Sequence, residues 1–407
     1  MVNTLNYMEE STKKLRIIFS SNALYSNSGY GNQMHDLLPQ IKDAGYPLAH
    51  VAFFGLEGAP INLNGIKVYP KMGSMWGEDA LLHHGNDFNA DISMCLQDIW
   101  TLEMNTVRAM KRFIPWTMVD HQPPPPGVLE RLQAAYRIIT ASKFGKSELS
   151  KLGFYSTYIP LTVDTEIFKP LQQSKAELRK EFGIPPDIFL FGMVSANKDN
   201  PPRKSFQEVI DAFEIFHKKY PKSGIYFHTI LNQQGGFPID VYARSKGIDK
   251  AIYHLEPYTQ MFKIGKPEMS RIMNSLDCLL APSTNEGFGV PLIEAQACGI
   301  PVITNNFTAM PELITKDSGL LTDVIFKRFS PMGAYIGHPD TQSIYNQMIE
   351  VYNRGEEGRK KMGEAGRKNA VDNYDSKTIF KTHWLKFFET LENEVYPVET
   401  PKVDAKL

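Results

Sequence analysis

The stretch PSTNEGFGVPLIEAQACGIPV, Pro282–Val302, decides the fold of this chain. The apolar residues 277–281 before it are typical of a buried parallel strand that ends at a proline. Residues 290–298 are expected to form a short helix, because Gly299 and a proline two residues later supply the usual stop signals. Residues 302–304 then begin the next strand. The pattern predicts a β-loop-α-β unit.

Two carboxylates, Glu286 and Glu294, lie in this unit. In parallel α/β sheets, ligands bind outside the carboxyl ends of the strands, near free N–H groups at helix starts. Gly287 and Gly289 allow a ligand to approach the backbone closely. A carboxylate at Glu294 can accept paired hydrogen bonds from vicinal hydroxyls such as those of a ribose. The alternative is a solvated loop glutamate and an exposed helix glutamate, but the glycine and proline frame favours a binding site.

The motif Glu286-Gly-Phe-Gly, Glu294-Ala and Gly299-x-Pro301-Val302 resembles the Glu-x7-Glu signature of retaining glycosyltransferases, in particular family 4 (group 1). The resemblance implies an α/β GT-B fold, in which two Rossmann-like domains with doubly wound parallel sheets face each other across a cleft. It also implies that Glu286 holds the transferred sugar and Glu294 the ribose. The resemblance assigns donor contacts to the backbone of Gly287, Phe288, Gly289 and Val290.

Composition agrees with a multi-domain globular enzyme. A chain of 407 residues predicts two or three domains, and 42% hydrophobic with 22% charged residues is ordinary. A net charge of −1 gives no indication of a nucleic-acid partner. The three cysteines lack the spacing of a zinc site or a disulfide framework. Residues 1–12 are polar and no apolar run approaches the ~20 residues of a membrane span, so we expect a cytoplasmic protein.

Alternating strands and helices in the first half predict a second α/β domain. Strands are expected at residues 15–20, 48–54 and 66–70, with a helix over 31–44. The predicted divisions are an N-terminal, acceptor-side domain, a nucleotide-sugar donor domain, and a terminal helix that packs back on the first domain and ends in a tail. They cover residues 1–170, 171–373 and 374–407, with the tail from 397. A linker, at which few contacts cross between the domains, is expected over 169–187. Five terminal residues recur at helical spacing and are predicted to be core, namely Phe380, Trp384, Phe387, Phe388 and Leu391.

The first loop offers glycines near a helix start. Gly29 and Gly31 place backbone N–H groups where a phosphate or sugar oxygen could bind. The segment fails as a dinucleotide fingerprint, because Met34 occupies the position of the third glycine. It resembles the glycine-rich first loop of GT-B enzymes. The alternative is a flexible loop that uses glycines only to turn.

A histidine follows the strand predicted over residues 114–119. Asp120 and His121 precede Gln122 and four prolines, and the prolines are expected to force extended backbone and exclude a helix. In the resemblance, a polar residue at the end of this strand faces the transferred sugar, so His121 is the candidate and Asp120 the weaker one. A purely structural histidine is the alternative.

Cations follow the first strand of the second domain. Arg203 and Lys204 come just before a helix whose residues 205–208 have capping-box spacing, and this arrangement suits a diphosphate. A solvated basic turn is the alternative. The resemblance places an arginine several residues before the lysine, where this chain has Asn197 and Lys198. Arg203 and Lys198 therefore compete for one role, and Lys204 is the firm assignment.

These parts predict retaining sugar transfer from a nucleotide sugar, UDP- or GDP-linked, to a glycan, lipid or small-molecule acceptor. Arg203 and Lys204 would stabilise the departing diphosphate. The resemblance implies no protein nucleophile, and the absence of an Asp-x-Asp sequence argues against an essential metal. The alternatives are a sugar-nucleotide epimerase, a phosphorylase that uses pyridoxal phosphate, and a degenerate carbohydrate-binding scaffold. Residues 107–113 mix basic and apolar side chains, so they either touch an anionic membrane or form a solvated helix.

Overall fold

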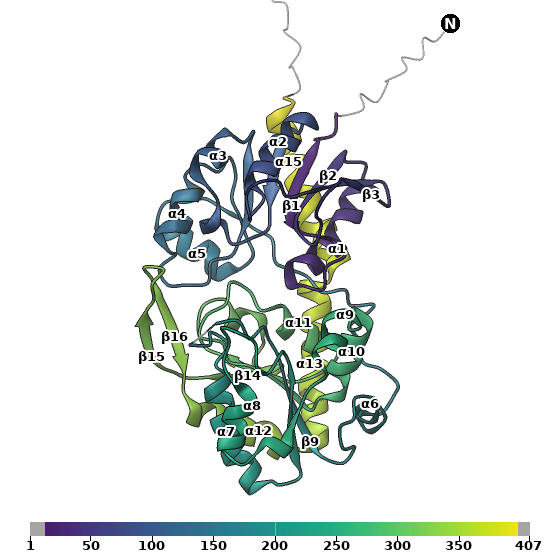
Figure 1. Ribbon diagram of the computed structural model, residues 1–407, viewed down its shortest axis with the longest axis vertical. Coiled ribbons are helices and arrows are strands. Elements are labelled where there is room, and N and C mark those ends of the chain that lie inside the picture. Colours follow the sequence, from purple (N-terminus) through teal and green to yellow (C-terminus); the bar gives the residue numbers. More distant parts are fainter. Residues whose placement is uncertain (1–12, 200, 398–407) are drawn as a thin grey trace, which may run out of the picture.

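The computed structural model describes residues 13–199 and 201–397, which form two α/β domains joined end to end (Figure 1). The polar segment 1–12 and all but the first residue of the tail expected over 397–407 lie outside the described residues. None of the helices in the described ranges has the length and hydropathy of a membrane span. Cys95, Cys278 and Cys298 are buried free thiols.

The first domain is built on an eight-stranded sheet of order β3-β4-β2-β1-β5-β6-β7-β8. Neighbouring strands pair in parallel, except that β3 is antiparallel to β4. The predicted strands at 48–54 and 66–70 are confirmed, and the first strand is displaced by two residues. The strands are β1 (Ile17–Asn22), β2 (Leu48–Phe54), β3 (Ile61–Leu63), β4 (Ile66–Pro70), β5 (Ile92–Cys95), β6 (Phe113–Thr117), β7 (Ile139–Thr140) and β8 (Thr157–Tyr158).

The second domain has a parallel six-stranded sheet of order β11-β10-β9-β12-β13-β14, followed by an antiparallel hairpin, β15–β16, that was not predicted. The predicted β-loop-α-β unit is confirmed as β12, α11 (Val290–Ala297) and β13. The strands are β9 (Phe189–Val194), β10 (Ser223–His228), β11 (Ile252–Tyr253), β12 (Cys278–Ala281), β13 (Val302–Asn305), β14 (Gly319–Thr322), β15 (Val324–Phe329) and β16 (Tyr335–Pro339).

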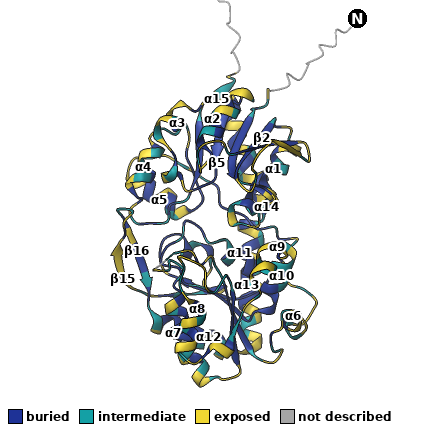
Figure 2. Cartoon of the chain, viewed as in Figure 1, coloured by how far each residue is buried: buried dark blue, intermediate teal, exposed yellow. Residues whose placement is uncertain are grey.

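Helices cover both sheets, with their buried faces turned inward (Figure 2), and most of the large buried side chains are apolar. The expectation that the proline run excludes a helix is wrong at its last residue. Pro126 begins α4, at the first helical position, where a missing N–H removes no helical hydrogen bond. The helices are α1 (Gly29–Asp43), α2 (Glu78–Asp87), α3 (Met104–Ala109), α4 (Pro126–Leu132), α5 (Lys143–Lys151), α6 (Lys175–Glu181), α7 (Phe206–Lys219), α8 (Ile239–Ser245), α9 (Pro257–Phe262), α10 (Lys266–Ser275), α12 (Thr341–Asn353) and α13 (Gly355–Tyr374).

Both sheets change direction at one pair of neighbouring strands. In the first sheet β1 lies beside β5, and in the second β9 lies beside β12, although each pair is far apart in the sequence. The loops after these four strands diverge to opposite faces of their sheets, and ligands of doubly wound proteins bind in the space between such loops. The fold therefore places the segments after β9 and β12 together at one sheet edge.

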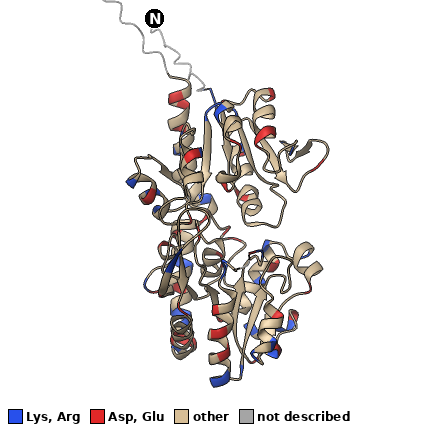
Figure 3. Ribbon diagram, turned by 60° about the vertical axis from the view of Figure 1, so that its left-hand side comes forward, with Lys and Arg blue, Asp and Glu red and all other residues tan. Residues whose placement is uncertain are grey.

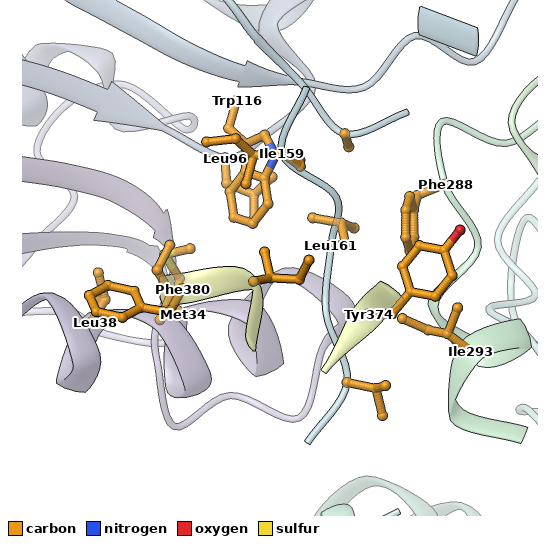
Figure 4. Packing of buried hydrophobic residues seen from close by; sticks show 14 of the residues in the cluster. Met34, Leu38, Leu96, Trp116, Ile159, Leu161, Phe288, Ile293, Tyr374 and Phe380 are labelled. Carbon is orange, nitrogen blue, oxygen red and sulfur yellow. The ribbon is translucent and has the colours of Figure 1, made fainter. Parts of the chain in front are cut away.

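The end of the chain packs against the first domain. Trp384 is 1% exposed and lies edge-on to Trp116 of β6, with 4.9 Å between ring centroids. Phe388 contacts Tyr46 with centroids 5.0 Å apart, and Phe380 lies beside Met34 and Leu38 (Figure 4). The core placement predicted for the five terminal residues is confirmed. The predicted terminal helix is confirmed as one continuous helical run over residues 376–395, in which a π-helical turn at Phe380–Trp384 joins α14 (Ser376–Ile379) to α15 (Leu385–Val395).

The C-terminal half of the predicted linker packs on the second domain. The guanidinium of Arg179 in α6 is buried and donates to Asp277 Oδ2 at 2.6 Å, and Lys175 Nζ lies 2.9 Å from Asp277 Oδ1. Burial alone would raise the pKa of Asp277, but the two cations hold it below its ordinary value. This ion cluster fixes α6 to the second domain, and the expectation of few contacts between the domains at the linker stays a prediction.

The segment 107–113 is not an exposed apolar surface. Its apolar residues Val107, Met110 and Phe113 are buried in the first domain, and Lys111 faces Asp91 at 3.8 Å. The helix alternative is therefore closer to the structure, since α3 ends at Ala109 and the large apolar side chains of the segment are buried.

Replacing Trp384 by alanine should destabilise the protein by about 3–5 kcal/mol, because it removes a large buried side chain that contacts the first sheet. Denaturant unfolding measures the change. The matched control is Tyr155→Ala, since Tyr155 is 95% exposed and its loss should cost less than about 0.5 kcal/mol. Equal effects of the two substitutions would contradict the packing described above.

Candidate active site

Glu286 lies at the centre of a partly buried ion cluster. It follows β12, and its carboxylate accepts a hydrogen bond from Arg203 Nη1 at 2.9 Å and pairs with Lys204 Nζ. Arg203 Nη1 also donates to the backbone carbonyl of Asn285 at 2.8 Å. The structure thus brings together the glutamate and the two cations that the sequence placed 82 or 83 residues apart.

The charges of this cluster act strongly on one another. Burial alone would raise the pKa of Glu286, but Arg203 and Lys204 outweigh it and hold that pKa at about 2. The pKa of Lys204 is lowered, first by burial and then by the neighbouring Arg203. Burial would also lower the pKa of Arg203, but Glu286, Asp120 and Asp199 outweigh it, so three carboxylates surround the two cations. Cationic side chains held in this way can bind an anionic ligand.

Strained backbone flanks Glu286 on both sides. Ser205, directly after the two cations, has φ +58°, and Thr308, whose hydroxyl accepts from Glu286 N at 3.1 Å, has φ +50°. Non-glycine residues with such angles are uncommon and cluster at functional sites. The predicted capping box at residues 205–208 is wrong, because Ser205 has this left-handed conformation and its side chain makes no cap hydrogen bond.

His121 is part of a polar chain that links the two domains. Its Nδ1 lies 2.7 Å from Asp120 Oδ1, and Asp120 Oδ2 accepts from Asn285 Nδ2 of the second domain at 3.1 Å. With Nδ1 engaged, the other ring nitrogen is left for a ligand. Asp120, the weaker candidate from the sequence, is the residue that orients His121.

The glycine-rich loop has a different physical basis from the one expected. A Cβ at Gly287 would lie 2.6 Å from Met118 Cβ of the first domain. The missing side chain at this position therefore allows the two domains to approach each other, and it does not serve the approach of a ligand. Gly289 has φ +126° just before Val290 begins α11. The Phe288 side chain is buried against Tyr374 (Figure 4), so only its backbone remains for the donor contact that the resemblance assigns.

Glu294 is buried on the second turn of α11, so the exposed alternative is wrong. Burial raises the pKa of its carboxyl group to about 7, although Lys266 opposes this. Lys266 pairs with Asp36 of α1 across the domain boundary. The Glu294 carboxyl group itself has no hydrogen-bond partner within the described ranges. This arrangement leaves it able to accept from a ligand.

The first loop contributes less through its glycines than through Tyr30 and Asp98. Gly31 N donates to Ser28 Oγ, and a Cβ at Gly31 would clash with Ser26, so this N–H is already used and the glycine serves packing. Gly29 is exposed. Tyr30 Oη donates to Asp98 Oδ1 at 3.2 Å, and burial, then Asp98 and Asp120, raise the Tyr30 pKa.

Neither Tyr30 nor Asp98 was singled out in the sequence. They follow β1 and β5, the pair of neighbouring strands at which the first sheet changes direction. Desolvation and Asp120 raise the pKa of Asp98, whereas Lys198 and Arg203 of the second domain oppose the rise. The strand order was the missing information, because nothing in the local sequence places β1 beside β5.

Lys198 and Asn197 differ in role. Lys198 is exposed in the loop after β9. It lies close enough to Asp98 and Lys204 for its charge to lower the pKa of both groups. Asn197 is 1% exposed, donates to Phe237 O at 2.7 Å and accepts from Phe237 N at 2.7 Å, so it holds the loop. Lys198 is therefore the only one of the two whose side chain faces solvent.

Within residues 13–199 and 201–397, no three His, Cys, Asp or Glu side chains form a group that could hold a metal ion. Metal independence of the activity stays a prediction.

The model of the family described as glycosyl transferases group 1 matches residues 174–369, just under half of the chain. The matched residues include Arg203, Lys204, Glu286 and Glu294.

Known proteins resemble the chain in sequence over part of its length and in structure over most of it. The O-antigen biosynthesis glycosyltransferase WclY of Escherichia coli is 31% identical over 166 residues, which cover 38% of this chain and 41% of WclY. The chain thus spans about two fifths of the length of the curated relatives it matches. Sucrose-phosphate synthase from Thermosynechococcus elongatus has a TM-score of 0.72 at 13% identity and covers 93% of this chain and 99% of its own.

Anabaena HepE in complex with UDP and glucose has a TM-score of 0.68 at 16% identity, covering 93% of this chain and 100% of its own. Such identities show the fold alone. Together with the two parallel sheets, these whole-length similarities confirm the predicted two-domain GT-B fold.

Replacing Glu294 by glutamine should stabilise the protein at pH 8. The folded-state pKa of this acid lies near 7, above its ordinary 4.5, so its contribution to stability falls as pH rises from about 4.5 through 7. Glutamine removes the buried charge, and we expect a gain of roughly 1–3 kcal/mol at pH 8 in denaturant unfolding. At pH 5 the wild-type carboxyl is protonated, so the two proteins should be nearly equal. The same difference at both pH values would contradict the raised pKa.

Proposed function

We propose that this protein is a retaining glycosyltransferase of family 4 that transfers a sugar from a nucleotide sugar to a hydroxyl acceptor. The observation that supports this most is the Arg203–Lys204–Glu286 cluster, with Glu294 buried eight positions further on, within the residues that match the group 1 model. Two neighbouring cations and an unpartnered carboxyl group suit a donor with a diphosphate and a ribose.

Each residue of the site is assigned to one chemical group of the donor. Arg203 and Lys204, helped by Lys198, stabilise the negative charge that grows on the diphosphate as the anomeric bond breaks. Glu286, already ionised, accepts hydrogen bonds from hydroxyls of the transferred sugar, together with the backbone of Gly287, Phe288, Gly289 and Val290. Glu294 accepts from the ribose hydroxyls.

On the acceptor side, we assign the N-terminal domain, residues 1–170. His121 is oriented by Asp120 toward the sugar, and the Tyr30–Asp98 pair offers a carboxylate to an acceptor hydroxyl. Retention follows if the donor phosphate itself takes the acceptor proton, and no protein nucleophile is assigned. Three buried thiols without a disulfide fit a reducing compartment, and we propose a cytoplasmic enzyme with a UDP- or GDP-linked donor.

Lys204→Ala should lower kcat/KM for donor turnover about 10²–10³-fold, because it removes one of the groups that stabilise the leaving diphosphate. The control is Lys316→Ala, an exposed lysine that makes no ion pair among the residues described. The donor must be identified first, in a thermal-shift panel of UDP, GDP and ADP conjugates. A nucleotide sugar that binds, at 100 times its dissociation constant, should raise the free energy of unfolding by about 2.7 kcal/mol.

The products of the donor so identified then decide the reaction. Proton NMR of the new glycoside should show the anomeric configuration of the donor. An isomerised nucleotide sugar formed without acceptor would instead indicate the epimerase. Donor binding without turnover in either assay would indicate the carbohydrate-binding scaffold.

Activity should be unchanged in excess chelator, because Arg203 and Lys204 supply the cationic charge that a divalent ion provides in metal-dependent transferases. Initial rates with and without chelator, and after re-addition of Mg²⁺ or Mn²⁺, measure this. Loss of activity that the metal restores would contradict the proposal of a metal-free donor site.

A further inference from the structure

Two of the four tryptophans of this chain are exposed. Trp116 and Trp384 are each 1% exposed, whereas Trp76 and Trp100 are 38% and 44% exposed. An indole is a large apolar group that usually packs inside a protein or against a bound molecule. The two exposed indoles therefore indicate a surface that binds a ligand.

Both exposed tryptophans lie at the edge of the first sheet that faces the second domain. Trp76 belongs to the segment after β4, and Trp100 to the segment after β5. The strands β4, β2, β1, β5 and β6 pair in parallel, so their carboxyl ends share one edge. Asp120, which follows β6 at this edge, accepts from Asn285 of the second domain at 3.1 Å. The two tryptophans are thus at the same sheet edge as the candidate active site.

Along this edge, the two tryptophans lie on opposite sides of Asp98. The ring of Trp76 packs edge-on against Phe53 of β2, with 6.3 Å between the ring centroids. Trp100 lies beside α4, which follows β6, and a Cβ at Gly127 would be 3.5 Å from Trp100 Cβ. Asp98 follows β5, and β5 lies between β6 and the β1–β2 pair. The two side chains therefore extend from Asp98 in opposite directions.

Gln97 fixes the loop of Trp76 next to this carboxylate. It is 2% exposed, and its side-chain Nε2 donates to the backbone oxygen of Trp76 at 3.3 Å. Asp98 accepts from Tyr30 Oη at 3.2 Å and remains open to solvent. A ligand that reaches Asp98 therefore has an indole on each side.

The segments around the tryptophans offer no free cation. Four segments follow β1, β2, β4 and β5, at residues 23–28, 55–60, 71–77 and 96–103. Lys71 is the only basic residue in their sequence, and its Nζ lies 3.1 Å from Glu57 Oε1. Elsewhere cations and carboxylates are interspersed over both domains (Figure 3). These segments therefore suit a neutral ligand, whose hydroxyls can donate to Asp98.

We propose that the acceptor is a carbohydrate chain whose sugar rings pack on Trp76 and Trp100, an assignment that rests on the proposed function. One face of a sugar ring carries C–H groups that pack against an indole, while the hydroxyls around its rim hydrogen-bond to polar side chains. The acceptor hydroxyl donates to Asp98, and rings of the chain lie on the two tryptophans beside it.

A hydrocarbon tail is the other occupant that exposed apolar side chains favour. Met72 and Met75, in the segment of Trp76, are 48% and 71% exposed. A hydrocarbon tail that covered both tryptophans would also cover Asp98, and burying a carboxylate without a hydrogen-bond donor costs free energy. The hydroxyls of a carbohydrate supply that donor. The carboxylate between the indoles therefore selects sugar rings.

Iodide quenching of tryptophan fluorescence tests this assignment on the full chain. Iodide reaches Trp76 and Trp100 but not the two tryptophans that are 1% exposed, so the quenched part of the emission reports on the proposed surface. The probes are methyl glycosides of glucose, galactose and mannose and of their disaccharides, with and without the nucleotide found in the thermal-shift panel. Disaccharides should protect the emission from iodide at lower concentration than monosaccharides, and farnesyl phosphate should not protect it.

Trp76→Ala and Trp100→Ala should each weaken disaccharide binding roughly tenfold in saturation-transfer difference NMR, because each removes one ring of the surface. Trp76→Phe and Trp100→Phe keep an aromatic ring, so they should bind more tightly than the alanine variants, and they serve as folded variants if alanine is not tolerated. The matched control is Tyr155→Ala, an aromatic residue 95% exposed just before β8, which should bind as wild type does. Thermal unfolding checks that each variant is folded.

The outcomes separate this proposal from the proposed function. A wild-type protein that binds a nucleotide sugar but no saccharide would overturn the carbohydrate acceptor and leave the transferase proposal standing. Saccharide binding that both alanine variants retain would also overturn it, and protection by farnesyl phosphate alone would favour a hydrocarbon tail instead. Saccharide protection that both alanine variants weaken, without binding of any nucleotide sugar, would support the surface and overturn the proposed function.

Discussion

The negative charge of Glu286, on a side chain only 15% exposed, is the constraint on which the candidate site depends. A carboxylate largely removed from water must be compensated, and Arg203 and Lys204 do this from the end of a different strand. Their meeting requires β9 and β12 to be neighbours, which is a property of the doubly wound sheet. It also requires the strained backbone at Ser205 and Thr308, and the sheet on either side is rigid enough to impose that strain.

The same region fixes how the two domains face each other. Asn285, next to Glu286, donates to Asp120, and Gly287 lets its loop approach Met118. Further away, Glu312 accepts from Lys143 N and Phe144 N, both at 2.8 Å, so a carboxylate of the second domain caps a helix of the first. The domain boundary is therefore polar and specific near the site, where a ligand must find its partners already in place.

Much of the local structure could be predicted from the sequence. Buried apolar runs gave the parallel strands, and a glycine with a proline marked the end of α11, because these signals act within a few residues. The failures have physical causes as well. The capping box at Ser205 fitted the spacing but not the left-handed backbone of that residue. The π-helical turn in the terminal helix was missed because the spacing of its aromatics does not distinguish it from an α-helix.

The sequence by itself determined the fold class, the Glu286 and Glu294 pair, and the cations near the start of α7, because each is written in a short segment. The tertiary structure alone decided that Glu286 is held by those cations, that Glu294 is buried with a raised pKa, and that Tyr30 and Asp98 meet. These facts depend on strand order and on the packing of two domains. Both are set by the balance of burial and pairing over the whole chain, which no local pattern contains.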